Sequence, residues 1–188
     1  MNRNGNTADV LFSSSADYIF TNSGTVNISN FNLNADDITL EINGNAGINL
    51  TNDLDFQPNN TDIEVTNNNT STLTLNRIFF NDDNCSFINN GTVVLNDALE
   101  VNSDNADQNN FVTNNGTLTI AADIDASNCD FFVYNNGTVS SNGFTAIDGT
   151  NGFYNYDGAF WNYGGARMYP MSDTGPLLMG AQELLRQP

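Results

Sequence analysis

The sequence predicts an all-β fold, a single-stranded parallel β-helix (solenoid) with three strands in each coil. Three observations predict it. Apolar and polar residues alternate, as in Ile38–Ile42 and Thr72–Leu75, and this is the period of a β-strand. A short Asn- and Gly-containing motif recurs about every 22 residues. Each repeat also carries three short apolar pairs, which together make roughly seven coils of three strands.

In the repeated motif, Asn is followed two positions later by a small residue, normally Gly, and then by Thr. Seven copies share it, the second, third and last being weaker, with the small residue at Gly24, Ala46, Ser71, Gly91, Gly116, Gly137 and Gly158. A propeller blade needs about 40 residues, which is too long for this period. A sandwich of hairpins is the competing architecture, but it should place two-residue Asn-Gly turns between paired strands. Here the Asn-Gly turn recurs once in each period instead.

The three apolar pairs define the three strands of a coil in order. The first strand leads into the Asn, as Phe87 does before Asn89, and the second follows the Gly-Thr, as Val93 and Leu95 do. The third comes later, with copies at Phe31 and Leu33, Leu54 and Phe56, Leu99 and Val101, and Ile124 and Ala126. Each strand should stack on its copy in the next coil about 4.8 Å away, with alternate side chains turned inward.

A structural ladder is expected at the bend between the first and second strands. Stacked amides can hydrogen-bond along a column, and the candidates are Asn22, Asn89, Asn114 and Asn135. The glycines of the same motif, Gly24, Gly91, Gly116 and Gly137, can take the positive φ that such a bend often needs. The Thr after each Gly should point outward, because the residue that follows it points into the core.

These patterns divide the chain into three parts. Residues 1–17 are expected to form an N-terminal cap or lead-in strand, and residues 18–164 the parallel β-helix. After Gly165 the strand pattern stops, and Pro170, Gly175 and Pro176 mark a linker. Residues 165–188 are therefore expected to be this linker followed by a short helix over 177–186 or a tail.

Charge composition excludes several function classes. The chain has 4 Lys and Arg, all of them Arg, against 22 Asp and Glu, with no His and a net charge of −18. A His-activated nucleophile, a Schiff-base Lys and a His-ligated zinc are therefore impossible. So acidic a surface repels phosphate, and we expect no nucleic-acid partner. No apolar run reaches 18 residues, so no membrane-spanning helix is expected.

Acidic residues gather between the third strand of one coil and the first strand of the next. The metal-ligand candidates at this phase are Asp36, Asp37, Asp82, Asp83, Asp104 and Asp107, and Asp62 and Asp130 share it. Stacked turns would bring these carboxylates close together, and calcium takes about six to eight oxygen ligands. The alternative is a solvated acidic edge that aids solubility. No carboxylate pair stands out as a glycosidase pair would, so no catalytic residue is assigned and no enzyme is expected.

Aromatic residues concentrate near the end of the predicted solenoid. They are Phe153, Tyr154, Tyr156, Phe160, Trp161 and Tyr163. A solenoid must cover its open end, so these residues are expected to form a capping coil. The alternatives are a sugar-stacking platform or a contact between protomers.

The two cysteines are expected not to form an intramolecular disulfide. Cys85 and Cys129 each precede a Phe by two positions and lie two periods apart. Equivalent positions two coils apart would be about 9.6 Å from one another, beyond the roughly 7 Å that a disulfide spans between Cα atoms.

The Asn-x-Gly-Thr-Val-x-Ile unit, seen in full at Asn22–Ile28, resembles the repeats of right-handed parallel β-helix proteins, especially the passenger domains of bacterial adhesins and autotransporters. The resemblance covers roughly residues 18–163 and implies an exported, elongated protein. Many such proteins bind surfaces or self-associate, and some cleave polysaccharides.

The function expected from these observations is an extracellular structural or adhesive module. It would self-associate through the solenoid ends into a fibre or surface layer, or act as a rigid stalk. A polysaccharide-binding or polysaccharide-cleaving domain is the alternative, with carbohydrate as partner. Ice binding by the outward Thr column, Thr25, Thr92, Thr117 and Thr138, is a further alternative. The first residues lack the apolar core of a signal peptide, while the composition favours an extracellular or cell-surface location.

Overall fold

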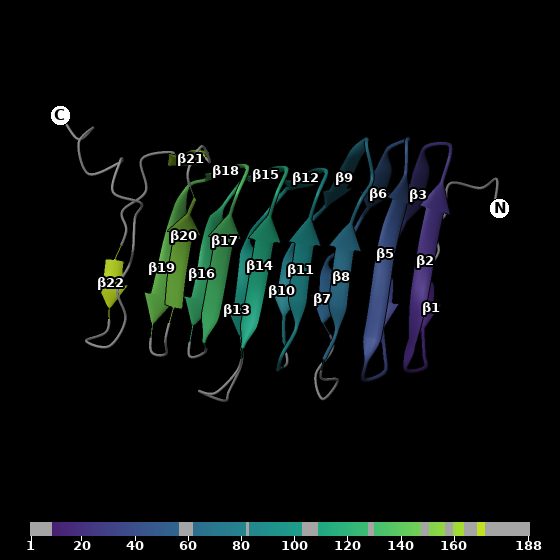
Figure 1. Ribbon diagram of the computed structural model, residues 1–188, viewed down its shortest axis with the longest axis horizontal. Helices are drawn as coiled ribbons and strands as arrows, with labels where there is room; N and C mark the ends of the chain where they lie inside the picture. Colours follow the sequence, from purple (N-terminus) through teal and green to yellow (C-terminus); the bar gives the residue numbers. More distant parts are fainter. Residues whose placement is uncertain are drawn as a thin grey trace.

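The computed structural model describes residues 9–56, 62–81, 83–102, 109–127, 130–147, 151–156, 160–163 and 169–171. Over these residues the chain winds as a parallel β-solenoid with one strand of each coil in each of three sheets (Figure 1). The predicted fold class is confirmed, with about 22 residues in each turn and about six to seven coils. In the described part of the chain, no helix is long and apolar enough to span a membrane.

Every third strand along the chain pairs in parallel with its copy in the next coil. Sheet A contains β1 (Val10–Phe12), β4 (Phe31–Leu33), β7 (Leu54–Phe56), β10 (Ile78–Phe80), β13 (Leu99–Asn102), β16 (Asp123–Ser127), β19 (Gly143–Ile147) and β22 (Tyr169–Met171). Sheet B contains β2 (Ala16–Asn22), β5 (Ile38–Gly44), β8 (Glu64–Asn67), β11 (Ser86–Asn89), β14 (Asn110–Asn114), β17 (Phe131–Asn135) and β20 (Asn151–Asn155). Sheet C contains β3 (Val26–Ile28), β6 (Ile48–Leu50), β9 (Thr72–Leu75), β12 (Thr92–Leu95), β15 (Thr117–Ile120), β18 (Thr138–Ser141) and β21 (Phe160–Tyr163).

The core is a column of apolar side chains enclosed by the three sheets. In β12, Val93 and Leu95 are fully buried. Thr92 and Val94, which alternate with them along the strand, face outward and are half-buried. Within the column, Phe56 stacks on Phe80 of the next coil with ring centroids 4.5 Å apart. Each such side chain contributes about 1.5–3 kcal/mol by leaving water, so the alternating pattern that predicts the strands also supplies the stability of the coil.

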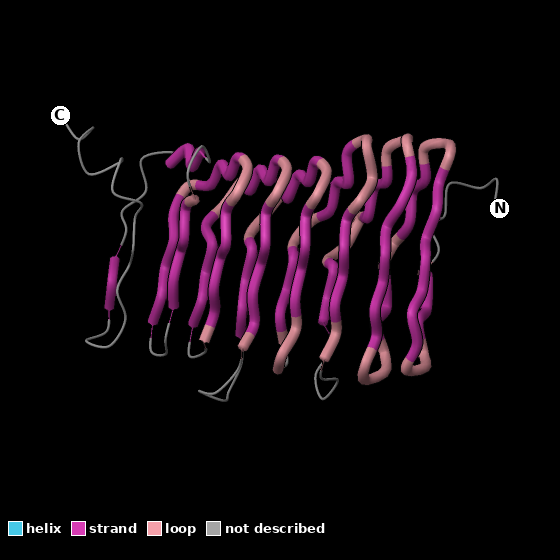
Figure 2. Tube along the Cα trace, viewed as in Figure 1, coloured by secondary structure: helices cyan, strands magenta, loops and turns pink. Residues whose placement is uncertain are grey.

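The chain turns between sheets A and B, B and C, and C and A in each coil, and loops of successive coils line up along the rod, as Figure 2 shows. The loop between sheets B and C changes length between the third and the fourth coil. Five positions separate Asn67 from Thr72, but three separate their register partners Asn89 and Thr92. Coils on either side of this point are therefore offset by two residues at this bend.

This offset corrects the expected ladder. Asn22 lies opposite Gly44, not in the column of Asn89. The column of Asn89 continues through Asn67 to Ile42 and Phe20. The local motif around Asn22 matches the later copies, but the pairing between coils decides which residues stack.

The strand register also corrects the prediction that the segments Cys85–Phe87 and Cys129–Phe131 occupy equivalent positions two coils apart. Phe87 lies opposite Val112, which lies opposite Val133, so Phe131 is not its equivalent. The buried thiol of Cys85 donates to the backbone oxygen of Asp83, with 3.3 Å between sulfur and oxygen. Cys129 lies outside the described residues.

Sheet A reaches into both predicted flanking segments. In the segment expected to be a cap or lead-in strand, β1 pairs with β4. In the segment expected to be a linker, β22 pairs with β19. The helix expected over 177–186 lies outside the described residues.

Candidate functional site

The bend between sheets B and C holds a buried ladder of Asn side chains. Its members are Asn67, Asn89, Asn114 and Asn135, all fully buried. The Nδ2 of each donates to the Oδ1 of the next, at 2.9, 2.8 and 2.8 Å in turn. The Nδ2 of Asn114 also donates to the backbone oxygens of Gly116 and Thr138, at 3.1 and 3.0 Å. Buried amides are tolerated here because each finds partners in the same column.

A second, exposed Asn ladder runs beside the first. It consists of Asn68, Asn90, Asn115 and Asn136, and each Nδ2 donates to the Oδ1 of the preceding coil at 2.8 Å. The donors therefore point toward the N-terminal end, opposite to those of the buried ladder. Sequence reasoning missed this ladder and Asn67. The available signal was the Asn-Asn pair that precedes Gly91, Gly116 and Gly137.

Asn22 occupies a similar bend with different contacts. Its Nδ2 donates to the backbone oxygens of Gly24 and Ala46, at 3.2 and 2.9 Å. Its register partner Gly44 has φ 153°, and a Cβ there would lie 1.9 Å from Asn22 Oδ1. At this coil, glycine makes room for the amide instead of a second amide stacking on it.

Three of the four motif glycines, Gly91, Gly116 and Gly137, are needed for space rather than for a positive φ. Among the described glycines only Gly44 has a positive φ, which corrects the expectation for Gly24, Gly91, Gly116 and Gly137. A Cβ on Gly91 would lie 2.2 Å from the backbone oxygen of Asn69, and one on Gly116 or Gly137 would lie 2.0 or 2.1 Å from the glycine oxygen of the preceding coil. Gly24 has nothing within 4 Å of this position.

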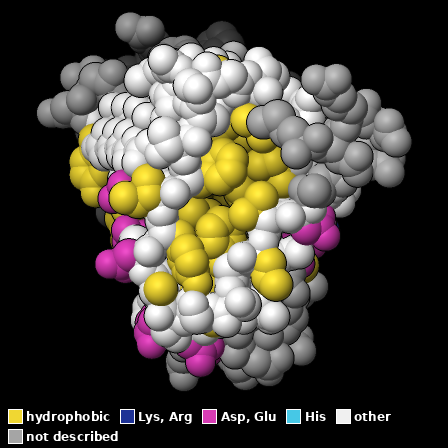
Figure 3. All heavy atoms as spheres, turned by 90° about the vertical axis from the view of Figure 1, so that its right-hand side faces the viewer, with side chains coloured by type: hydrophobic (Ala, Val, Ile, Leu, Met, Phe, Trp, Pro, Cys, Tyr) yellow, Lys and Arg dark blue, Asp and Glu magenta, His cyan; other side chains and the backbone are white. Residues whose placement is uncertain are grey.

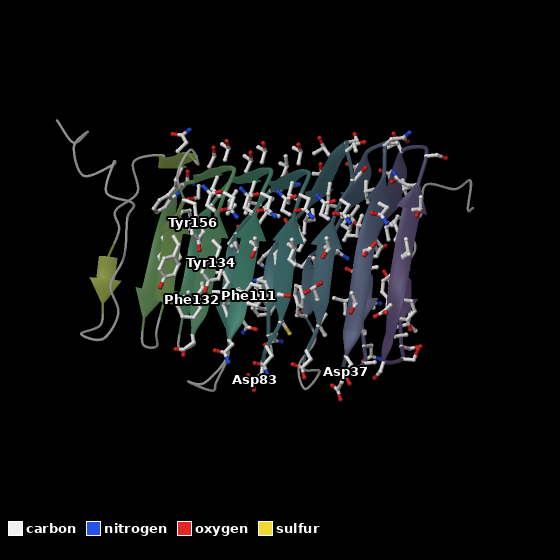
Figure 4. All side chains as sticks on the ribbon, viewed as in Figure 1. Asp37, Asp83, Phe111, Phe132, Tyr134 and Tyr156 are labelled. Atoms are coloured by element: carbon white, nitrogen blue, oxygen red, sulfur yellow. The ribbon has the colours of Figure 1, made fainter. Side chains whose placement is uncertain are left out.

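Three of the predicted metal ligands, Asp36, Asp37 and Asp83, are among the described residues, and all three lie at the turns between sheets A and B. Asp36 and Asp37 are exposed before β5, and Asp83 is half-buried before β11; Asp37 and Asp83 appear at the same edge in Figure 4. Asp82, Asp104 and Asp107 lie outside the described residues. No group of three potential ligands that could hold a metal ion occurs within the described part of the chain. A calcium site stays a prediction.

The backbone supplies a separate reason for Asp and Asn at this edge. Asp37, Asp62 and Asn84 have φ values of 51°, 60° and 55°, and they are the only non-glycine residues of the described segments with a positive φ. The strand register places all three at the same point of successive coils. Asp and Asn tolerate this left-handed conformation better than other side chains, so the turn itself favours them without a bound metal.

Arg77, the one Arg among the described residues, is held by two carboxylates on neighbouring coils. Its Nη2 lies 2.7 Å from Asp53 Oδ2, and its Nη1 donates to Glu100. Its guanidinium carbon lies 4.5 Å from the centre of the Phe79 ring. Burial works against the charge of the guanidinium, but the hydrogen bonds and attraction of both carboxylates outweigh burial and raise the pKa of Arg77. This cation is already neutralised within the protein.

An aromatic patch lies on the outer face of sheet B near its C-terminal end (Figure 4). We use this name for Phe111, Phe132, Tyr134, Tyr154 and Tyr156. Tyr134 is the centre of the patch, because its ring centroid lies 5.3 Å from that of Tyr154, 6.2 Å from that of Phe132 and 6.3 Å from that of Phe111. Tyr156 is 49% exposed. Such a surface presents ring faces and phenolic hydroxyls together.

The patch shares only two residues with the predicted terminal aromatic cluster, Tyr154 and Tyr156. Phe153 and Trp161 instead point into the core, where their rings stack with centroids 4.1 Å apart. Phe160 and Tyr163 belong to β21, but their side chains lie outside the described set. Phe111, Phe132 and Tyr134 were missed. Strand alternation was the available signal, since Phe131 and Val133 face inward and the residues after them must face out.

The surroundings of Tyr134 in the aromatic patch raise the pKa of its hydroxyl. Burial raises its pKa above the usual value of 10.0, and the nearby Tyr154 and Tyr156 raise it further. The phenol therefore stays neutral at physiological pH and can both donate and accept a hydrogen bond.

Comparison of the chain with protein-family models, with curated proteins and with solved structures gives no significant match. The parallel β-solenoid is seen directly in the strand pairing. The resemblance to adhesins and autotransporters rests on the repeat motif alone.

Proposed function

We propose that the chain is an extracellular structural and adhesive module of the adhesin type, a rigid rod that associates end to end. The observation that carries this proposal is the N-terminal end of the described solenoid. Strands β1, β2 and β3 each pair on one side only within the described residues. An open strand edge is a template for pairing with another chain.

Apolar side chains accompany these open edges. Val10, Tyr18, Phe20 and Val26 pack against the core but stay partly exposed, and Figure 3 shows hydrophobic side chains across the centre of this end. A further coil from a second copy would cover both the strand edges and this apolar surface. End-to-end association extends the same stacking that holds one coil on the next.

Negative-stain microscopy and sedimentation across a concentration series test this proposal. The native chain should form linear assemblies whose length grows with concentration. Val26→Asp, which places a charge at the N-terminal end, should keep the rods single. Thr119→Asp is the matched control, because it adds the same charge on the outer face of sheet C away from the end. Single rods of the native chain at every concentration would contradict the proposal, with circular dichroism verifying that each variant is folded.

Polysaccharide binding is the second candidate function, and the aromatic patch favours it. Neighbouring aromatic rings that face outward and are half-buried provide a stacking surface that the apolar core does not require. Retention of the protein on immobilised polysaccharides is the first test. Release of reducing ends would extend the role to cleavage.

A further inference from the structure

We propose that the aromatic patch is a binding site for a glycan without acidic groups, whose pyranose faces stack on the rings of Phe132, Tyr134 and Tyr154. This inference rests on the polysaccharide-binding role and names its site and the chemistry of its ligand. It does not depend on end-to-end assembly of the rods.

The fold itself does not require aromatic side chains at these positions. In the other coils, the register position of Tyr134 and Tyr154 is occupied by Ile19, Glu41, Thr66, Ile88 and Thr113. The position of Phe111 and Phe132 is occupied in other coils by Asp17, Thr39, Glu64, Ser86 and Gly152. Sheet B thus accepts small, charged and apolar residues on its outer face, so the solenoid does not require rings at these positions.

The ring geometry leaves surface for a ligand. The rings of Tyr134 and Tyr154 are nearly parallel, with 13° between their planes, and their centroids are 5.3 Å apart. Carbon atoms in full contact lie only about 3.5–4.0 Å apart, so these two rings overlap only in part. Both side chains are half-buried, so part of each remains exposed to solvent. Gly152 makes this arrangement possible, since a Cβ there would lie 2.8 Å from Tyr154 Cε2.

Phe132 extends the surface along the strand. Its ring is 22° from parallel to that of Tyr134 and 32° from parallel to that of Tyr154, with centroids 6.2 and 6.3 Å apart. The three ring centroids thus lie within 6.3 Å of one another, and each of these half-buried side chains keeps part of its surface exposed. Two of the three rings carry a phenolic hydroxyl. A pyranose ring matches such a surface because it has apolar C–H faces and hydroxyls at its rim.

Charge selects among glycans. The net charge of the chain is −18, and Arg77, the described Arg, is already paired with Asp53 and Glu100. A uronate or sulfated glycan would be repelled and would find no available cation in the described residues. A neutral or amino-sugar glycan meets no such repulsion, and aromatic faces also attract an ammonium group.

Isothermal titration calorimetry of the full chain tests the inference. The probes are neutral hexasaccharides of glucose, mannose, galactose and N-acetylglucosamine, and a hexamer of galacturonate. At least one neutral probe should bind, and galacturonate should bind at least tenfold more weakly. Tyr134→Ala should weaken binding by tenfold or more, while Tyr134→Phe, which keeps the ring, should lose much less. Thr66→Ala changes the same register position three coils away and should bind as the native chain does.

Several results would overturn the inference. They are no binding of any neutral probe at millimolar concentration, preferred binding of galacturonate, or equal binding by folded Tyr134→Ala and Thr66→Ala variants. Tyr156→Ala, at an exposed position, provides a second variant with little risk of misfolding.

A side-by-side dimer of the native chain that dissociates in the Tyr134→Ala variant would identify the aromatic patch as a protein interface instead. Linear assemblies without glycan binding would contradict this inference alone, and binding by single rods would contradict the assembly proposal alone.

Discussion

Neighbouring residues at the bend between sheets B and C differ in how strongly their side chains are needed for stability. Asn114 lies in the buried ladder, whereas its neighbour Asn115 lies in the exposed one. Each donates one side-chain bond of 2.8 Å to a neighbouring amide of its column, and Asn114 also donates to two backbone oxygens. Burial and these additional bonds together set the cost of losing the amide of Asn114.

Asn114→Ala should lower the free energy of unfolding by about 1–3 kcal/mol, because it leaves buried polar partners unsatisfied. Asn115→Ala should change it by less than about 0.5 kcal/mol, because water replaces the lost bond. Urea denaturation followed by circular dichroism measures both. Equal effects of the two substitutions would mean that burial does not set the value of the ladder.

Gly116 and Gly24 occupy the same point of the motif but different surroundings. Gly116→Ala should destabilise the protein by about 1–3 kcal/mol, because its Cβ would overlap the backbone oxygen of Gly91 and force the coils apart. Gly24→Ala should leave stability unchanged or raise it by up to about 1 kcal/mol, since space is free and the unfolded chain loses freedom. Thermal unfolding of both variants checks this contrast, and a stabilised Gly116→Ala would refute the close approach.

At the scale of elements, strand alternation decides which side chains face the core and which face solvent. In β17, Phe131 and Val133 are fully buried, and Phe132 and Tyr134 face outward. Of the three aromatic residues in this strand, Phe131 belongs to the core, and Phe132 and Tyr134 belong to the aromatic patch. The patch arises where outward aromatic residues coincide on β14, β17 and β20.

The titration of Tyr134 reports on the patch as a unit. Its pKa is raised by burial and by Tyr154 and Tyr156, so the native state holds this proton at pH values where the unfolded chain has released it. The stabilisation is fully present below pH 10 and is lost as pH rises through the higher native pKa. Spectrophotometric phenolate titration of the native chain and of Tyr134→Phe should give a difference curve with its midpoint above 10.0. A midpoint below that value would show that Tyr134 is not enclosed by its neighbours.

On the scale of the whole molecule, net charge opposes the association that the open end favours. Two rods of charge −18 repel each other, and salt screens this repulsion over about 10 Å at 0.1 M ionic strength. End-to-end assembly should therefore increase with salt. At 0.5 M sodium chloride the screening length falls to roughly 3–5 Å. Sedimentation velocity should therefore show larger species at this salt concentration than at low salt. Assembly that weakens as salt rises would indicate an interface held by charge pairs instead.

The sequence by itself determined the solenoid, because its signals are local and repeated. The two-residue alternation assigns Leu73, Val93 and Leu118 to the core, and the Asn-Gly motif marks the bend once per coil. Parallel stacking follows, since an identical turn in every period makes each strand lie beside its own copy. The placement of acidic residues between sheets A and B follows in the same way.

Only the tertiary structure decided which residues of different coils meet. Loops of unequal length shift the register by two residues, which separates Asn22 from the buried ladder and adds Asn67 to it. The same pairing turns Phe153 and Trp161 into the core and brings Tyr134 beside Tyr154. Neighbours across a parallel sheet are set by pairing between coils more than about 20 residues apart, so no local pattern specifies them.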